Sequence, residues 1–284
     1  MKRNALRLCV VLACACIWAG GCAKNLQSCP CGSEWTNLLD EALSHWDVWL
    51  ADPHSSIKEL PEGYTRGKAI GSSDPYDVYA TEKDANGDWV MKVTGMVYGG
   101  LTSKAVYENF HLTLEFKWGE KKWAPRLNEK RDSGILYHCT GEHGAMWKVW
   151  KKSVELQIME EDFGDLFLLG GPTAMVTVED DLVWNPSVEP RLREGQVARA
   201  IRSVDTESPH GEWTRIDLYV LGDSAVHMVN GTAVMALNEI KLDGEPLSAG
   251  QLQLQSEGAE CYYRDVRIRS ITALPEALAE AITK

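Results

Sequence analysis

Ten short segments after Asn86 alternate apolar and polar residues with the two-residue period of a β-strand. The segments span residues 89–94, 96–102, 110–118, 134–139, 154–159, 213–221, 225–229, 232–237, 250–255 and 262–269. Asn230-Gly231 predicts a two-residue hairpin turn, because both residues tolerate a positive φ. Only residues 274–282 have a helical pattern. The chain is therefore predicted to be all-β, a jelly-roll β-sandwich with a short C-terminal helix.

The region before these strands has no clear period. Residues 35–49 mix leucines and tryptophans, and we expect irregular structure there. Residues 51–88 are rich in Pro, Gly, Ser and Asp, which predicts a long surface loop system. Long loops in compact domains often carry function.

The N-terminus has the pattern of a secretory signal over residues 1–21. Three basic residues precede an apolar run over residues 8–21, which is shorter than the roughly 20 residues of a membrane-spanning helix. Small residues before Cys22 resemble a bacterial lipobox, in which the cysteine is lipidated; ordinary cleavage that leaves Cys22 as a thiol is the alternative. Residues 22–33 suit a tether. We expect an exported protein of the cell envelope or periplasm that meets the membrane only through this lipid anchor.

The charge of the chain excludes one class of partner. The net charge is -12, and removal of residues 1–21 brings it to -15, with 26 Lys and Arg against 41 Asp and Glu. Such a surface repels phosphate backbones, so nucleic acid is not an expected partner. With 44% apolar residues, the remainder can form a core. We expect one folded domain over residues 34–272 and a helical tail over residues 273–284.

Four cysteines remain once the signal is removed and Cys22 is lipidated: Cys29, Cys31, Cys139 and Cys261. These cysteines could form one or two disulfides in an oxidising compartment, and the sequence does not choose among the three pairings that four cysteines allow. Zinc is disfavoured at Cys29 and Cys31, because no second Cys or His pair stands at zinc-ligand spacing.

Two of the predicted strands carry polar side chains on one face. They lie within residues 131–138 and 153–160. In the second strand the apolar residues at 154, 156 and 158 alternate with Glu155 and Gln157, which therefore project together from the opposite surface. This arrangement predicts a sugar-binding or catalytic wall.

An ordered set of short motifs resembles the bacterial 3-keto-disaccharide hydrolase domain, a family with a concanavalin A-like jelly-roll fold. The matching pieces are residues 99–104, 107–110, 114–116, 132–135, 155–158, 211–213, 227–231, 254–258 and 264–268. They follow the family order over roughly residues 35–270. The resemblance implies a jelly-roll enzyme that acts on oxidised glycosides, so that its partner is a carbohydrate.

The chain departs from the family pattern at three positions. The family usually has Asn-Ser-Gly and a closing arginine, where this chain has Asp132 and His138, and it often has a histidine where Glu257 stands. A changed donor or charge alters what a site can bind, so these positions bear on substrate preference and on activity.

The activity that the resemblance implies sets requirements for the site. A ketone at C3 makes the C2 proton acidic, so the C1 substituent can be eliminated and water can then add. The site needs a base, an oxyanion stabiliser and help for the leaving group. In our hypothesis Glu155 is the base or a metal ligand and Gln157 orients the sugar. His138 would polarise the ketone, assist departure or bind a metal. Glu155, His138 and Glu160 could together hold a divalent cation that stabilises the enolate.

Structural alternatives stand beside these roles. Glu155 could be a strand carboxylate paired with a nearby Lys or Arg, and His138 a hydrogen-bonded strand histidine. Four further residues are candidates for substrate binding: Asp132, Trp123, Arg264 and Glu257. Trp123 lies in a polar loop and could stack on a sugar ring.

Two further classes of function remain open for the chain. One is a noncatalytic carbohydrate-binding module and the other is a structural surface protein, because the same fold hosts lectins.

Overall fold

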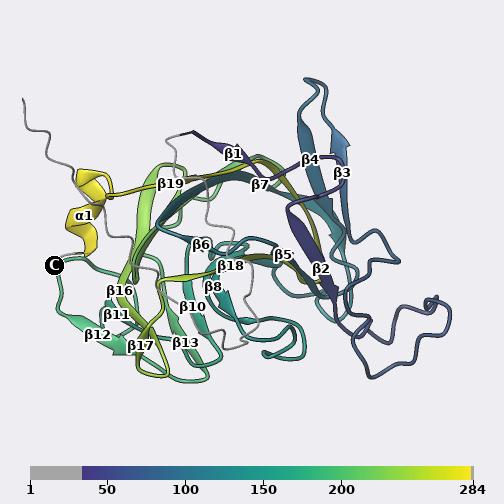
Figure 1. The fold of residues 1–284 in the computed structure, drawn as a ribbon, viewed down its shortest axis with the longest axis horizontal. Coiled ribbons are helices and arrows are strands. Elements are labelled where there is room, and N and C mark those ends of the chain that lie inside the picture. The colour runs from purple at the N-terminus through teal and green to yellow at the C-terminus, as the bar shows by residue number, and fades with distance from the viewer. Residues whose placement is uncertain (1–33, 283–284) are drawn as a thin grey trace, which may run out of the picture.

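The structure is a computed structural model that describes residues 34–282. The predicted signal, the tether, Cys22, Cys29 and Cys31 lie outside the described residues. Two antiparallel sheets pack face to face, and one hydrophobic cluster fills the space between them (Figure 1). The jelly-roll β-sandwich predicted from the sequence is confirmed.

The larger sheet has eleven strands in the order β12-β11-β16-β15-β14-β7-β19-β4-β3, with β1 paired to β19 and β17 to β16. Its strands are β1 (Thr36–Asn37), β3 (Tyr79–Lys83), β4 (Trp89–Val93), β7 (Phe110–Lys122), β11 (Thr173–Thr177), β12 (Pro190–Arg193), β14 (Thr214–Leu221), β15 (Ser224–Val229), β16 (Thr232–Leu242), β17 (Glu245–Pro246) and β19 (Ala259–Ser270). The long strands β7 and β19 arch over the molecule (Figure 1).

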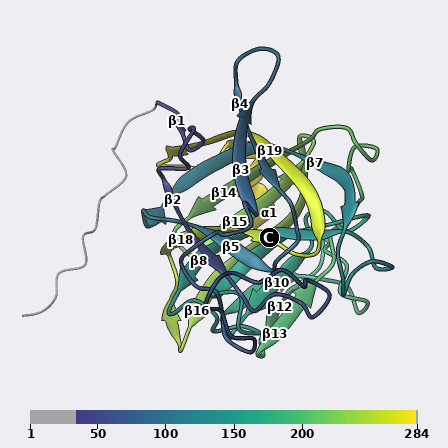
Figure 2. The same cartoon turned by 90° about the vertical axis from the view of Figure 1, so that its right-hand side faces the viewer.

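The second sheet has eight strands in the order β13-β10-β9-β8-β18-β5-β2, with β6 paired to β18. Its strands are β2 (Trp46–Leu50), β5 (Gly99–Ser103), β6 (Tyr107–Glu108), β8 (Asp132–Thr140), β9 (Lys152–Met159), β10 (Leu166–Leu169), β13 (Val197–Ala200) and β18 (Ala249–Ser256). Figure 2 shows this sheet below the arch of β7 and β19. Neighbours β9, β8 and β18 come from distant parts of the sequence, and they form the centre of the sheet.

All ten predicted strands are present, with ends that differ by a few residues. The hairpin is also confirmed, since Asn230 and Gly231 have φ angles of 48° and 79° between β15 and β16. The helical tail forms α1 (Glu276–Ile282), which lies beside the end of β16 (Figure 1). Within residues 34–282 no helix is long and apolar enough to cross a membrane.

Two regions that were not expected to be regular contain strands. Residues 46–50 form β2, which pairs with β5, although residues 35–49 were predicted to be irregular. The expected loop over residues 51–88 contains β3, an edge strand that pairs with β4. Edge strands are buried less than central ones, so their sequences alternate weakly. Both strands are therefore hard to recognise from sequence alone.

Both cysteines in the described residues, Cys139 and Cys261, are buried free thiols. Aromatic side chains fill the centre of the core, where Phe116 makes edge-on contacts with Trp118, Phe163 and Tyr263 at centroid distances of 4.7, 5.5 and 5.0 Å. Edge-to-face contacts of this kind add to the stability gained from burial.

His227 joins the two sheets through hydrogen bonds in the core. Its Nε2 lies 3.0 Å from the Tyr137 hydroxyl on β8, and its Nδ1 lies 3.2 Å from the Gly164 carbonyl. Burial lowers the pKa of His227 to about 4, because the charged form would lose its hydration.

We predict that His227 makes the fold sensitive to acid. Its folded pKa lies below the value of about 6.5 in an unfolded chain, so stability is full above that value and is lost as pH falls toward the folded pKa. When the pH is lowered from 7 to 4.5, the unfolding free energy should fall in both proteins. The fall should be about 2 kcal/mol smaller in His227→Gln than in the wild type. Denaturant titrations at the two pH values measure this difference, and equal losses would contradict the prediction.

Candidate functional site

Three carboxyl groups gather on the face of the eight-stranded sheet that points away from the core. Glu155 and Gln157 alternate along β9 with Leu156, which belongs to the core cluster. Gln157 pairs with Gly134 on β8, and Asp132 at the start of β8 forms a bridge with Glu257 after β18. Strand register therefore brings together residues that the sequence separates by up to 125 positions. We call Asp132, Glu155 and Glu257 the carboxyl cluster.

Gly134 lies beneath the polar ends of two neighbouring side chains. A Cβ atom at this position would lie 2.2 Å from Glu155 Oε1 and 2.5 Å from Gln255 Oε1. The missing side chain lets these two groups reach across β8 from strands on either side. Gly134 is thus required by close approach and not by an unusual φ.

Arg126 joins two members of the carboxyl cluster from outside the sheet. It lies in the loop between β7 and β8, and its Nη2 is 2.7 Å from Asp132 Oδ2. Its Nη1 is 3.4 Å from Glu257 Oε1, a longer and weaker contact. One guanidinium therefore serves two carboxyl groups, and the closer pair holds Asp132 more firmly in its charged form.

Burial raises the pKa of all three carboxyl groups. The pKa of Glu155 is raised well above its ordinary value by burial and by the charges of Asp132 and Glu257. Burial also raises the pKa of Asp132, against the opposing charge of Arg126, while burial and Asp132 raise the pKa of Glu257. The cluster as a whole therefore holds protons near neutral pH, and the titrations of its three groups depend on one another.

Tyr98 lies at the edge of the carboxyl cluster. Burial, followed by the charge of Glu257, raises the pKa of its hydroxyl to about 12. Its ring is stacked on Trp150 at a centroid distance of 6.4 Å. The neutral hydroxyl is therefore held beside the cluster as a proton donor.

Several buried polar atoms of this region have no hydrogen-bond partner among the described residues. They are Asp132 Oδ1, Gln157 Oε1, Gln255 Oε1 and Arg126 Nε. Most buried polar atoms in proteins are paired, and an unpaired one costs free energy. Three of these four atoms accept hydrogen bonds, so the region is suited to a ligand that carries hydroxyl groups.

The cluster is closed on one side and more open on the other. Residues 141–151, which connect β8 and β9 and which we call the strap, place Met146 and Trp150 against Leu136. On the opposite side the side chains of Arg126 and Glu257 are 21% and 17% exposed. The cluster is therefore nearer to solvent at Arg126 and Glu257 than at the strap.

The structure brings together four of the residues chosen from the sequence: Asp132, Glu155, Gln157 and Glu257. It adds three that were not chosen, namely Tyr98, Arg126 and Gln255. The alternation in residues 250–255 could have identified Gln255, because it shares a strand face with Gln253. No sequence signal identifies Arg126, whose position depends on a loop.

His138 does not join the carboxyl cluster, contrary to our hypothesis. It lies at an irregularity of β8 with a φ of 52° and is 1% exposed. Burial alone lowers its pKa to about 4, so no carboxylate charge reaches it. The bulge breaks the alternation that the sequence argument assumed, and the ring is sealed in the interior. Its nitrogens also lack partners among the described residues, so the alternative of a hydrogen-bonded strand histidine is wrong too.

Glu160 is also separate from Glu155. Its carboxylate lies 2.6 Å from Arg131 Nη1 and accepts a hydrogen bond from the Arg131 backbone. The suggested metal ligands Glu155, His138 and Glu160 thus face different surroundings. Among residues 34–282 no group of three or more His, Cys, Asp or Glu side chains is placed to hold a metal ion. Glu155, His138 and Glu160 therefore do not fit a shared metal ion.

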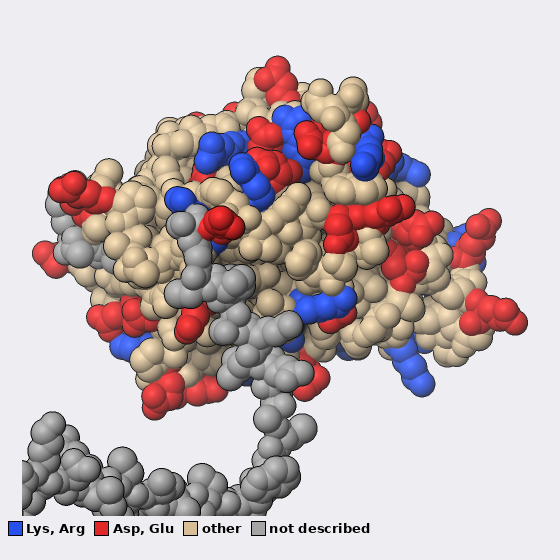
Figure 3. Space-filling view, turned by 45° about the horizontal axis from the view of Figure 1, so that its top comes forward, with Lys and Arg blue, Asp and Glu red and all other residues tan. Residues whose placement is uncertain are grey.

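Arg264 lies on the eleven-stranded sheet and not at the cluster, because β19 belongs to that sheet. Its Nε is 2.6 Å from Glu115 Oε2, and its guanidinium is 4.1 Å from the centre of the Trp213 ring. Lys and Arg are mixed with Asp and Glu on the face in Figure 3, so this face shows no basic patch. Trp123, in contrast to Arg264, lies close to the carboxyl cluster in the sequence, because it is three residues from Arg126 in the same loop.

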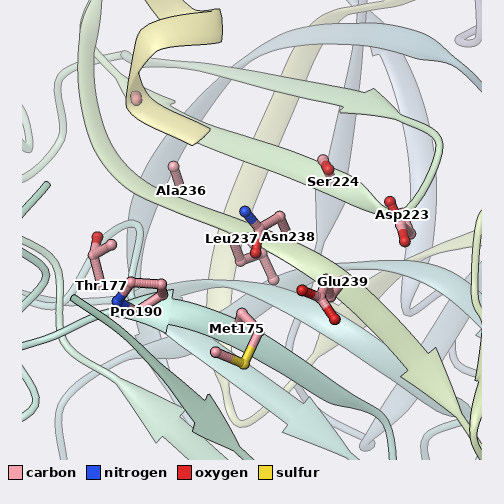
Figure 4. Close-up of a pocket in the computed structure, with 10 residues that line it drawn as sticks. Met175, Thr177, Pro190, Asp223, Ser224, Ala236, Leu237, Asn238 and Glu239 are labelled. Carbon is pink, nitrogen blue, oxygen red and sulfur yellow. The ribbon is translucent and has the colours of Figure 1, made fainter. Parts of the chain in front are cut away.

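A well-formed pocket near α1 has no connection with these residues. It has a volume of about 360 Å³ and lies between α1, β11 and β16 (Figure 4). Its lining contains two carboxyl groups, Asp223 and Glu239, but no histidine or cysteine. We place the candidate site at the carboxyl cluster because charge and unpaired acceptors meet there.

Comparison with known proteins identifies a family. The 3-keto-alpha-glucoside-1,2-lyase-like domain matches residues 34–269. A search of curated proteins finds no match.

Some solved structures are similar to this chain at low identity. A candidate glycosyl hydrolase from Parabacteroides distasonis is 17% identical, with a TM-score of 0.47, over 84% of this chain and 100% of that chain. A Bacteroides ovatus GH16 protein bound to its product is 12% identical, with a TM-score of 0.44, over 83% and 98%. The CBM66 carbohydrate binding module of Bacillus subtilis is 11% identical, with a TM-score of 0.40, over 68% and 92%. These likenesses are too distant to carry a functional argument.

We predict that Glu155 makes the protein less stable in alkaline solution. Its folded pKa is raised, so its contribution to stability is full below the unfolded value of about 4.3 and is lost as pH rises through the folded pKa. Glu155→Gln should therefore raise the melting temperature by more at pH 8 than at pH 5. Thermal unfolding at both pH values tests this, and an equal change at the two values would contradict it.

Proposed function

We propose that this chain, which belongs to the family of 3-keto-alpha-glucoside-1,2-lyase-like domains, cleaves 3-keto-glycosides by eliminating the substituent at C1. The observation that supports this most is the buried carboxyl cluster around Arg126. It supplies groups in different protonation states at one place, which acid–base chemistry requires.

The reaction needs a proton acceptor and a proton donor. A base removes the proton from C2, the bond between C1 and the leaving oxygen breaks, and a C1=C2 double bond forms beside the C3 carbonyl. The leaving oxygen takes up a proton. Addition of water across the new double bond then gives the free 3-keto-sugar.

Asp132 is the proposed base, in place of Glu155. It makes the closer contact with Arg126, at 2.7 Å, and that positive charge favours its ionised form. A carboxylate with a raised pKa is a stronger base than an ordinary one. Glu257 also contacts Arg126, but at the longer distance of 3.4 Å.

Glu155 is the proposed acid. Burial and two neighbouring carboxyl groups favour its protonated form, so it can donate a proton to the leaving oxygen. This reverses the base role suggested from the sequence, because burial beside other carboxyl groups was not visible there.

Arg126 and Tyr98 are the proposed stabilisers of the enolate oxygen that develops at C3. Arg126 carries a fixed charge, and the neutral Tyr98 hydroxyl can donate a hydrogen bond. The unpaired Oε1 atoms of Gln157 and Gln255 would accept hydrogen bonds from sugar hydroxyls.

We predict that two variants will separate the acid from the base. Glu155→Gln should lower kcat on an alkyl 3-keto-glucoside by about 100-fold or more, because the leaving alkoxide lacks a proton donor. It should recover much of its activity on the 4-nitrophenyl 3-keto-glucoside, whose leaving group is stable without a proton. Asp132→Asn should be slow on both substrates. Release of alcohol or nitrophenol measures each rate.

Glu115→Gln is the matched control, because Glu115 pairs with Arg264 on the other sheet. It should retain wild-type rates. Turnover by Asp132→Asn at the wild-type rate would remove Asp132 from the mechanism. If the wild type binds sugars in calorimetry but turns over no 3-keto-glucoside, the protein is a carbohydrate-binding module instead.

The protein is further proposed to act outside the cytoplasm, held to a membrane by lipidated Cys22. The basis is the sequence of residues 1–22. In a bacterial host, the full chain should collect in the membrane fraction, while Cys22→Ser should move to the soluble fraction. Cys29→Ser is the control and should stay with the membranes. If the two variants fractionate alike, Cys22 is not the anchor.

A further inference from the structure

A second pocket lies close to the carboxyl cluster and has a different chemical character. It has a volume of about 470 Å³. Its apolar lining residues are Ile57, Tyr76, Met96, Trp123, Ala124 and Leu127. They come from the long loop over residues 51–88, from the segment before β5 and from the loop that carries Arg126.

The pocket and the cluster share two segments, and a backbone hydrogen bond ties one of these to a third segment that carries a cluster residue. In the first, the Arg126 backbone N–H donates to the Trp123 carbonyl, so one turn of the loop carries a lining residue and a cluster residue. In the second, Met96 lines the pocket and Tyr98 lies beside the cluster. The tie is the hydrogen bond from the Trp123 backbone N–H to the carbonyl of Gly258, the neighbour of Glu257.

Trp123 is held firmly in this position. Its indole N–H donates to the Thr94 carbonyl at 2.9 Å, and the Lys121 ammonium lies 3.9 Å from the ring centre. Because one ring face carries Lys121 and the N–H is already bonded, Trp123 offers the pocket an apolar surface. This limits its use as a platform for a polar sugar.

The lining favours an aromatic occupant over a second sugar. A pocket of about 470 Å³ is in the usual range for small ligands and has room for one or two rings. The other four lining residues are Ser56, Lys58, Glu59 and Lys122. Sugar hydroxyls need hydrogen-bond partners when buried, and the six apolar side chains, which are the larger part of the lining, supply few. An aromatic group gains free energy from the same surface.

We infer that this pocket binds an aromatic leaving group, so that the substrates are 3-keto-glycosides of aromatic alcohols. The inference rests on the proposed elimination, in which the C1 substituent departs. With the sugar hydroxyls on the unpaired acceptors of the cluster, the substituent would extend past Arg126 toward Trp123. Leu127, which is 55% exposed, then closes over the ring.

The test compares leaving groups of matched chemistry. The 3-keto-glucosides of 2-phenylethanol and of ethanol release alkoxides of similar basicity. A difference in kcat/KM between the two substrates therefore reports binding of the ring. We expect the phenylethyl compound to be preferred by about tenfold or more. Leu127→Asp should reduce this preference to about threefold or less, because a charged side chain opposes the ring. Leu192→Asp is the matched control, since Leu192 is 51% exposed on β12 and outside the pocket.

A second measurement does not depend on turnover. Calorimetric titration with 2-naphthol should show saturable binding to the wild type and to Leu192→Asp, and binding at least about tenfold weaker to Leu127→Asp. Absence of binding together with equal kcat/KM for the two glucosides would overturn the inference while the elimination stands. A preference for a 3-keto-disaccharide over the phenylethyl compound would overturn it too. Binding that Leu127→Asp removes, without turnover of any 3-keto-glucoside, would support the pocket and reject the elimination.

Discussion

Three carboxyl groups lie together on a sheet face that is largely closed to water, and one arginine contacts two of them; this balance of charge governs the site. The charge of Arg126 meets two carboxyl groups, at 2.7 and 3.4 Å, so full ionisation of all three would leave buried negative charge uncompensated. Burial therefore raises their pKa values, and protons remain in the cluster. The same imbalance that lowers stability in alkaline solution supplies an acid and a base for chemistry. Stability and function thus oppose each other at this site.

The rest of the fold serves to maintain that arrangement. Strand register places Gln157 opposite Gly134, and the absence of a side chain at Gly134 lets the polar ends of Glu155 and Gln255 approach over it. The strap covers one side with apolar residues, which lowers the local dielectric and strengthens each charge interaction. On the other side the loop of Arg126 separates the cluster from the apolar pocket that contains Trp123.

Two of the positions that depart from the family pattern, Asp132 and Glu257, are neighbours in the structure. Asp132 stands where the family usually has asparagine and Glu257 where it often has histidine, and a backbone bridge joins these two positions. Each change adds a carboxyl group, and Arg126 contacts both. The sequence presents them as independent changes, whereas the structure makes them partners in one proton-sharing group. The change at His138 is unrelated, because that side chain is buried without any carboxylate nearby.

The sequence by itself determined the sandwich, its ten main strands, the Asn230-Gly231 hairpin and the polar face that carries Glu155 and Gln157. Those features follow from alternation and turn chemistry, which are local properties of the chain. Only the tertiary structure decided that His138 turns into the interior at a bulge, that Arg264 belongs to the other sheet, and that Arg126 reaches the cluster. Irregular register, the pairing of distant strands and the path of a loop depend on contacts between residues far apart in sequence. The pKa values depend on burial, which likewise exists only after the two sheets and their loops have packed.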